Sequence, residues 1–145
     1  MAAGVLGVKA FSDWQTTEAA AARDVAILDA AAQMATNLVS LGHQSVDEDL
    51  EKISDGTTGP IHDQLSASVL GFVDVLNEGQ VESTGEVKSA GIVDSTDDHA
   101  TVLAAVTSTV KNTEAPDGEI RVYRMKMTLD LVEGRWLVSN VEFVA

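Results

Sequence analysis

Apolar and polar side chains alternate along the last part of the chain, which is the pattern of a β-strand with one buried face. Glu133 and Gly134 follow this run and supply the two residues of a tight reversal. A second apolar run follows at 135–144, so residues 121–144 form a predicted β-hairpin. The alternating apolar positions are Tyr123, Met125, Met127, Leu129 and Leu131, and the polar positions between them are Arg124, Lys126, Thr128 and Asp130.

β-Branched residues dominate from about residue 81 onwards, and turn-forming residues divide this part of the chain into four predicted strands. The connections between them have the length of hairpin loops, which favours an antiparallel sheet. The predicted strands are 81–93, 100–111, 119–132 and 135–144, separated by turns at 94–98, 112–118 and 133–134.

Residues 13–41 predict a long amphipathic helix, because the segment is rich in Ala and contains neither Pro nor Gly. Its apolar side chains recur at helical spacing, which is typical of a stripe packed in a core; the seam of a coiled coil is the alternative. Gly42 follows where a helix C-terminus favours a residue with positive φ. The stripe consists of Val25, Leu28, Ala32, Ala35, Leu38 and Val39.

Two further helices are predicted before the strands begin. Ser45 and Glu48 have the spacing of a capping box, which predicts a short helix from residue 46 to about residue 54. Pro60 stands at the first position of a third helix, where its missing N–H costs nothing, and residues 77–79 break that helix. The apolar stripe of the third helix consists of Ile61, Leu65, Val69, Phe72 and Leu76.

The order of these elements determines the fold class, because the sheet can bury its apolar face only against the preceding helices. We therefore expect an α+β fold in which three N-terminal helices pack on a curved four-stranded antiparallel sheet, as a single domain over residues 13–145. Residues 1–12 are either the remnant of an N-terminal membrane anchor or a flexible start. The apolar run before Lys9 is far shorter than the roughly 20 residues that a spanning helix needs.

Acidic side chains outnumber basic ones by 23 to 9, which gives a formal net charge of -14. A nucleic-acid partner is not expected, because contact with a phosphate backbone requires a stripe of Lys and Arg. The imbalance lies in residues 1–110, which carry 17 acids and 4 bases, whereas residues 111–145 carry 6 and 5. Basic side chains thus gather on the last hairpin, where they either face an acidic partner or pair with acids on neighbouring strands.

No group of residues has the spacing of a catalytic or metal site. His43, His62 and His99 share no metal-binding pattern, and the acidic run at 47–51 has Lys52 where a calcium loop needs glycine. The glycines of a nucleophile elbow, a P-loop or a dinucleotide site are missing, and the chain has no cysteine. We therefore expect no enzymatic activity, no metal and no cofactor.

Two sets of side chains are candidates for binding. Tyr123, Met125 and Met127 face the space between the sheet and the helices, and with Phe72 they could line a cavity for a hydrophobic ligand. A filled core made of the same row is the ordinary alternative. Arg124 and Lys126 alternate with this row, so we expect them on the outer face of the sheet, available to a protein partner or to a second copy of the domain.

Three helices followed by a curved antiparallel sheet are also the order of the cone-shaped nuclear-transport-factor-2-like superfamily. Residues 14–144 resemble one family more closely, the soluble domain of the Mce-associated membrane proteins of actinobacteria, including mycobacteria, which are accessory proteins of mammalian-cell-entry lipid importers. The matching segments are TTEAAAARDVAILDAAAQMATNLVSL, SVDEDLEKISDGTTGPIHDQL, RVYRMKMTL and GRWLVSNVEFV.

The resemblance implies an extracytoplasmic domain at the cell membrane, held by a single N-terminal spanning helix whose last turns would be GVLGVKAF. It also implies a non-enzymatic accessory or scaffold subunit that stabilises an Mce-type lipid import complex, with the transporter subunits as partners. The family supplies no catalytic residues. The alternative function is a carrier that binds a lipid or sterol in a cavity between the helices and the sheet.

Overall fold

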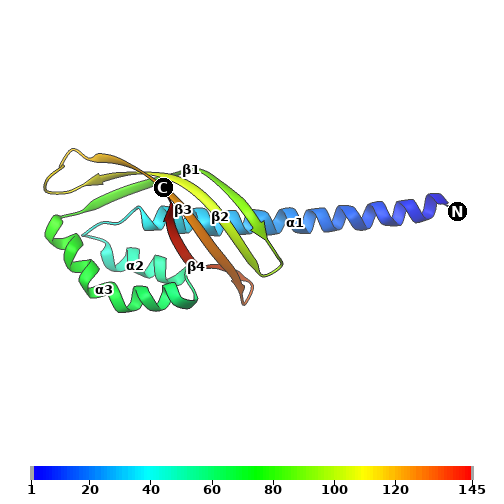
Figure 1. Cartoon of the computed structure of the whole chain (residues 1–145), viewed down its shortest axis with the longest axis horizontal. Helices are drawn as coiled ribbons and strands as arrows, with labels where there is room; N and C mark the ends of the chain where they lie inside the picture. Colours follow the sequence, from blue (N-terminus) through cyan, green and yellow to red (C-terminus); the bar gives the residue numbers. More distant parts are fainter. Residues whose placement is uncertain (1, 145) are drawn as a thin grey trace.

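A computed structural model of the chain describes the backbone of residues 2–144 and the side chains of residues 19–65 and 73–144. Figure 1 shows the sheet curving around the C-terminal part of the first helix, whose N-terminal part projects away from the domain. The expected α+β fold, with three helices before a four-stranded antiparallel sheet, is confirmed. The elements are α1 (Ala2–Leu38), α2 (Val46–Asp55), α3 (Gly59–Gly79), β1 (Glu82–Ser95), β2 (His99–Lys111), β3 (Glu119–Val132) and β4 (Arg135–Val144).

The strands follow one another across the sheet in the order β1-β2-β3-β4, and each neighbouring pair is antiparallel. Val102, Met127 and Val141 stand in register on three adjacent strands and turn toward the helices. The ladder of β1 and β2 shifts register between Val87 and Ser89 and again further along, and the ladder of β3 and β4 shifts once. Because each bulge adds twist, these shifts contribute to the curvature of the sheet.

The predicted bounds of β3 and β4 are confirmed, whereas β1 and β2 differ from the prediction by one or two residues at their ends. The turn between β3 and β4 has φ of 50° at Glu133 and 83° at Gly134. Two successive left-handed residues are what a two-residue type I′ hairpin requires. The turn chemistry therefore fixes the register of the last hairpin.

The buried face of α1 agrees with the predicted stripe only in part, since Ala35 and Val39 are buried as expected. Val25, which was placed in the stripe, is 58% exposed, whereas Ile27, Ala31 and Met34 are buried in the core. Ala occupies positions all round this helix, so the apolar pattern leaves its rotational phase poorly defined. The packed face is set instead by the large side chains that reach the sheet. α1 also begins at Ala2 rather than near residue 13.

The chain after α1 does not form the predicted glycine cap. The helix ends at Leu38, and Gly42 instead forms an isolated β-bridge with Glu82 and donates its N–H to Asp49 Oδ2 at 3.0 Å. The predicted capping box is also wrong, because Ser45 Oγ donates to the same Asp49 carboxylate at 2.9 Å and makes no capping bond to α2. The Asp49 carboxylate therefore bonds both Gly42 and Ser45, the residues that the sequence had assigned to the end of the first helix and the start of the second.

The third helix is longer than predicted. Pro60 lies at its start, as expected, but the helix continues through residues 77–79 and ends where Gln80 adopts a left-handed φ of 49°. The N–H of Val81 then donates to the carbonyl of Leu76. This closure brings the chain directly into β1.

One close approach holds β1 against the end of α1. A Cβ atom built on Gly85 would lie 2.0 Å from Val39 Cγ2 and 3.2 Å from the Val39 carbonyl oxygen. The Gly85 N–H donates to Ser40 Oγ at 2.8 Å, and Ser108 Oγ donates to the Val39 carbonyl at 3.0 Å. The absence of a side chain at Gly85 therefore allows the sheet to approach the helix terminus, beside the pocket described below.

Candidate functional site

The outer face of the sheet carries exposed apolar side chains where β3 extends beyond its pairing with β4. Ile120 is 75% exposed and Val122 is 68% exposed, and both alternate with residues that face inward. β4 pairs with β3 only from Arg124 onwards, so this end of β3 lies beyond the paired part of β4. We call the outward-facing set Leu103, Ile120, Val122, Arg124 and Lys126 the outer-face patch.

Arg124 and Lys126 lie on this patch, as predicted from the alternation. Arg124 stands between Ala105 and Val144 in the ladder, and Lys126 stands between Leu103 and Glu142. Both side chains are exposed, and none of the ion pairs found among the described side chains includes either of them. Arg124 and Lys126 thus border an apolar surface on a domain of net charge -14, and Glu142 stands opposite Lys126 on the neighbouring strand.

The inward row that was predicted to line a ligand cavity divides into two parts. Met125 and Met127 are fully buried and belong to the core cluster with Ile27, Met34 and Val138. Tyr123 is half-buried, packs at the edge of that cluster and makes an edge-to-face contact with Phe143, with ring centroids 5.9 Å apart. The side chain of Phe72, the fourth residue of this set, lies outside the described residues.

Tyr123 lines a pocket of about 270 Å³ at the end of the sheet, beside the end of α1. Its walls come from α1 and the loop after it, from α3, from Val81 just before β1, and from all four strands. Arg121 contributes the charged group of this lining. Hydrogen bonding to Tyr123 raises the pKa of Arg121 above its ordinary value, with a smaller contribution from Glu119. Among the described residues the lining is Leu38, Val39, Leu41, Leu76, Val81, Ser83, Ser108, Val110, Arg121, Tyr123 and Phe143.

Arg121 was not singled out by the sequence analysis, although its position contains a signal. It lies two residues before Tyr123 on the same strand and therefore faces the same side of the sheet. An Arg on the inward side of an alternating strand indicates either a solvent-exposed strand end or a charged group at a pocket.

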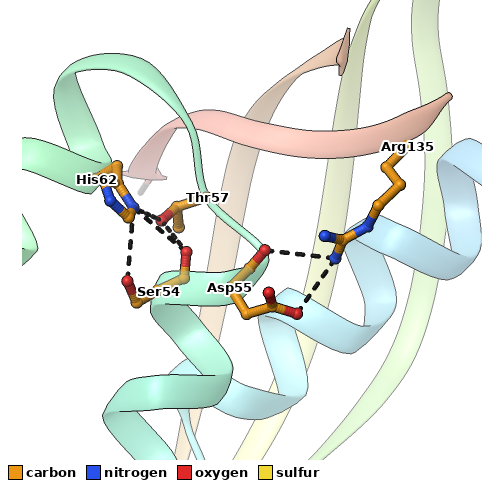
Figure 2. A network of polar contacts seen from close by, with 5 residues as sticks. All are labelled: Ser54, Asp55, Thr57, His62 and Arg135. Carbon is orange, nitrogen blue, oxygen red and sulfur yellow. Dashed lines mark hydrogen bonds and ion pairs between the residues drawn. The ribbon is translucent and has the colours of Figure 1, made fainter. Parts of the chain in front are cut away.

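Figure 2 shows a polar network at the junction of α2 and α3. The buried Thr57 donates its hydroxyl proton to the Ser54 carbonyl at 2.8 Å, so its oxygen accepts from His62 Nδ1, which lies 3.1 Å away. The carbonyl of Ser54 lies 3.3 Å from the same nitrogen. Since the ring nitrogen faces these acceptors, His62 carries a proton on Nδ1.

The same junction is attached to β4. Val138 donates to the Gly56 carbonyl and accepts from the N–H of Thr58, both at 2.9 Å. Arg135 donates to an Asp55 carboxylate oxygen at 3.2 Å, as Figure 2 also shows. The network therefore fixes the helical pair to the edge of the sheet. The adjoining hollow of about 760 Å³ is open to solvent and is lined by Glu48, Glu51, Lys52, Ser54, Asp55, Thr57 and His62.

The described side chains include no group of three His, Cys, Asp or Glu residues placed to hold a metal ion. Within that same part of the chain, no helix combines the length and the apolar character needed to cross a membrane.

The fold belongs to the class of nuclear-transport-factor-2-like cone domains, and it is shared with solved structures of low sequence identity. The periplasmic domain of DotI matches with a TM-score of 0.67 at 14% identity, over 83% of this chain and 94% of that one. An IcmL-like type IV secretion system protein from Legionella pneumophila matches with a TM-score of 0.64 at 8% identity, over 79% and 87%. At these identities the likeness shows the fold alone.

The sequence comparison identifies the family. Residues 1–145 match the family described as uncharacterized protein Rv1363c/MT1408-like, and the chain belongs to it. Mycobacterium tuberculosis Rv1363c, an uncharacterized protein, is 30% identical over 143 residues, covering 97% of this chain and 55% of the relative. This chain therefore spans about half the length of Rv1363c. A second relative from the same species, named outer membrane protein Rv1973, is 30% identical over 140 residues, covering 94% and 84%.

Proposed function

We propose that this domain is a non-enzymatic accessory subunit that stabilises an Mce-type lipid import complex at the cell envelope. Its contact with a transporter subunit is made through the outer-face patch. The observation that carries the proposal is that Arg124 and Lys126 are exposed, and take part in no ion pair among the described side chains, beside the exposed Ile120 and Val122. Exposed apolar area bordered by exposed charges is a surface suited to another protein.

The packing of the inner face supports a scaffold rather than an enzyme. Met125, Met127 and Leu129 are fully buried against α1, so the centre of the cone is filled by side chains. The pockets described above lie at the margins, and the large hollow near His62 is open to solvent. Among the described residues, a packed interior of this kind is what we expect of a domain that acts by contact with other proteins.

The placement at the envelope rests on the relatives and on the resemblance to the Mce-associated proteins. Rv1973 carries the name outer membrane protein, and the DotI domain that shares the fold is periplasmic. A single-pass anchor preceding an extracytoplasmic domain is part of the same proposal, with the transporter subunits as partners.

Charge reversal on the patch tests the proposed contact. We expect Arg124→Glu combined with Lys126→Glu to reduce co-purification with the transporter subunits at least about tenfold, because like charges across an interface repel. The free energy of unfolding should change by less than about 0.5 kcal/mol, since both side chains are exposed.

A matched control has the same change in charge at a distance from the patch. Lys52→Glu combined with Lys88→Glu places two reversals on α2 and on the edge strand β1. The control should co-purify as the wild type does. Equal recovery of the patch variant and the wild type would rule out this surface as the interface.

The alternative function is a carrier of a lipid or sterol, and the pocket beside Tyr123, with a volume of about 270 Å³, favours a small lipid over a sterol. Its test is native mass spectrometry of the domain purified from an actinobacterial host, followed by organic extraction and lipid analysis. A stoichiometric lipid would support the carrier, whereas an empty domain would argue against it.

A further inference from the structure

The pocket beside Tyr123 has a largely apolar lining that also contains a few polar side chains. Most of its lining is aliphatic or aromatic, and its volume is about 270 Å³. This lies just below the roughly 300–1,000 Å³ of pockets that hold drug-sized ligands. The space therefore suits a short apolar group rather than a fused ring system such as a sterol.

The two serine hydroxyls of the lining are already committed to the protein backbone. Ser108 Oγ donates to the Val39 carbonyl at 3.0 Å. Ser83 Oγ donates to the Leu41 carbonyl at 3.1 Å and accepts from the Leu41 N–H at 2.8 Å. These bonds stabilise the loop after α1, and they leave Arg121 as the charged group, with the Tyr123 hydroxyl beside it, available to a ligand in the described lining.

Arg121 is held only loosely by its neighbours. Its guanidinium lies 3.5 Å from a Glu119 carboxylate oxygen, and both side chains are about half exposed. An exposed ion pair of this length contributes little, and a guanidinium has five N–H donors. The guanidinium is positively charged throughout the physiological pH range, because Arg is not deprotonated in proteins.

The aromatic residues at the pocket form an apolar contact surface that the domain leaves uncovered. Phe143 is 63% exposed, although it is on the inward side of β4 and packs edge-to-face against Tyr123. An apolar group in the pocket would cover part of this ring and remove it from water.

We propose that this pocket binds a small amphipathic anion, an acyl carboxylate whose chain lies among Val39, Leu41 and Val110 and whose carboxylate pairs with Arg121. The ligand class follows from the lining, because the apolar walls accept an aliphatic chain and the guanidinium pairs with two carboxylate oxygens. The site is on the inner side of the sheet, so it stands independently of the scaffold contact proposed for the outer face.

Tyr123 is the only tyrosine of the chain, so a fluorotyrosine label gives a single fluorine NMR signal located in the pocket. The probe is octanoate, with octanol as the uncharged ligand of the same chain length. We expect a saturable shift of the signal with octanoate, and binding at least about tenfold weaker with octanol, which cannot form the charged pair.

Three substitutions test whether Arg121 is the positive charge that pairs with the carboxylate of octanoate. Arg121→Gln should weaken octanoate binding about tenfold and leave octanol binding unchanged. Lys88→Gln removes a positive charge elsewhere and should have no effect. Glu119→Gln should strengthen octanoate binding, because it removes the carboxylate that competes for the guanidinium.

The proposal is overturned if octanoate gives no saturable shift, if octanol binds as tightly, or if Arg121→Gln leaves octanoate affinity unchanged. Val110→Phe should fill the pocket and abolish the shift, with Leu41→Phe as a second variant should the first fail to fold. Full affinity in a folded pocket-filling variant would place the ligand elsewhere. Loss of transporter co-purification in the outer-face variant with octanoate binding retained would separate the two proposals.

Discussion

At the residue scale, single residues join neighbouring elements of the fold. The Asp49 carboxylate accepts hydrogen bonds from Gly42 and Ser45, Thr57 joins α2 to α3 through His62, and Gly85 allows Val39 to approach β1. Local rules for helix ends failed at Gly42 because its backbone bridges to Glu82 in the sheet, and at Ser45 because its hydroxyl bonds a side chain one turn further on instead of a backbone N–H. Substitutions at these contacts should therefore change the free energy of unfolding, as the next two predictions state.

Gly85→Ala should lower the free energy of unfolding by about 1–3 kcal/mol, because the added methyl group overlaps Val39 and its carbonyl. Gly91→Ala on the same strand is the matched control, since a Cβ there would meet no atom within 4 Å. Chemical denaturation of both variants gives the comparison. Equal stability would mean that β1 does not approach α1 in this way.

Thr57→Val should destabilise the domain by about 1–3 kcal/mol. The substitution preserves shape but removes the hydroxyl that bonds both His62 and the Ser54 carbonyl, and it leaves buried polar groups without that partner. Thr109→Val, at an exposed position of β2, serves as the control. Urea denaturation measures both, and a Thr57 variant as stable as its control would contradict the structural role of this network.

At the scale of elements, the sequence predicted the strands better than the helices. Alternation and the Glu133-Gly134 turn define β3 and β4 to the residue, because both signals are local to the hairpin. The stripe predicted on α1 was right at Ala35 and Val39 and wrong at Val25, because Ala on every side of the helix gives the apolar pattern little direction. Its buried face depends on which large residues reach the sheet.

The corrected phase of α1 can be tested by two truncations on one helix. Met34→Ala should cost about 2–5 kcal/mol of unfolding free energy, since the side chain is buried in the core. Val25→Ala should change it by no more than about 0.5 kcal/mol, because Val25 is mostly exposed. Thermal or urea unfolding checks both, and the reverse order would restore the originally predicted stripe.

The candidate site was partly accessible to the same reasoning. Alternation placed Arg124 and Lys126 on the outer face of the sheet and Met125 and Met127 on the inner face, and the structure confirms both placements. It could not decide whether the inner space is filled, because that depends on the residues that α1 directs at the sheet. For the same reason the pocket beside Tyr123, with Arg121 in its lining, required the three-dimensional arrangement.

At the scale of the whole molecule, the domain combines a packed core with an outer face that carries exposed cations and apolar side chains. A net charge of -14 keeps copies of the domain apart and favours a partner that meets the cations of β3. The accessory subunit proposed above would use this surface to act by contact rather than by chemistry. The pocket adds a separate site on the inner side of the sheet.

The most direct test of this account is photo-cross-linking in living cells from a benzoylphenylalanine introduced at Val122, compared with one introduced at Glu51 on the exposed face of α2. The account predicts that Val122 cross-links to a subunit of the lipid importer, identified by mass spectrometry, and that Glu51 does not. Cross-linking to such a subunit from Glu51 alone, or from neither position, would contradict an outer-face interface.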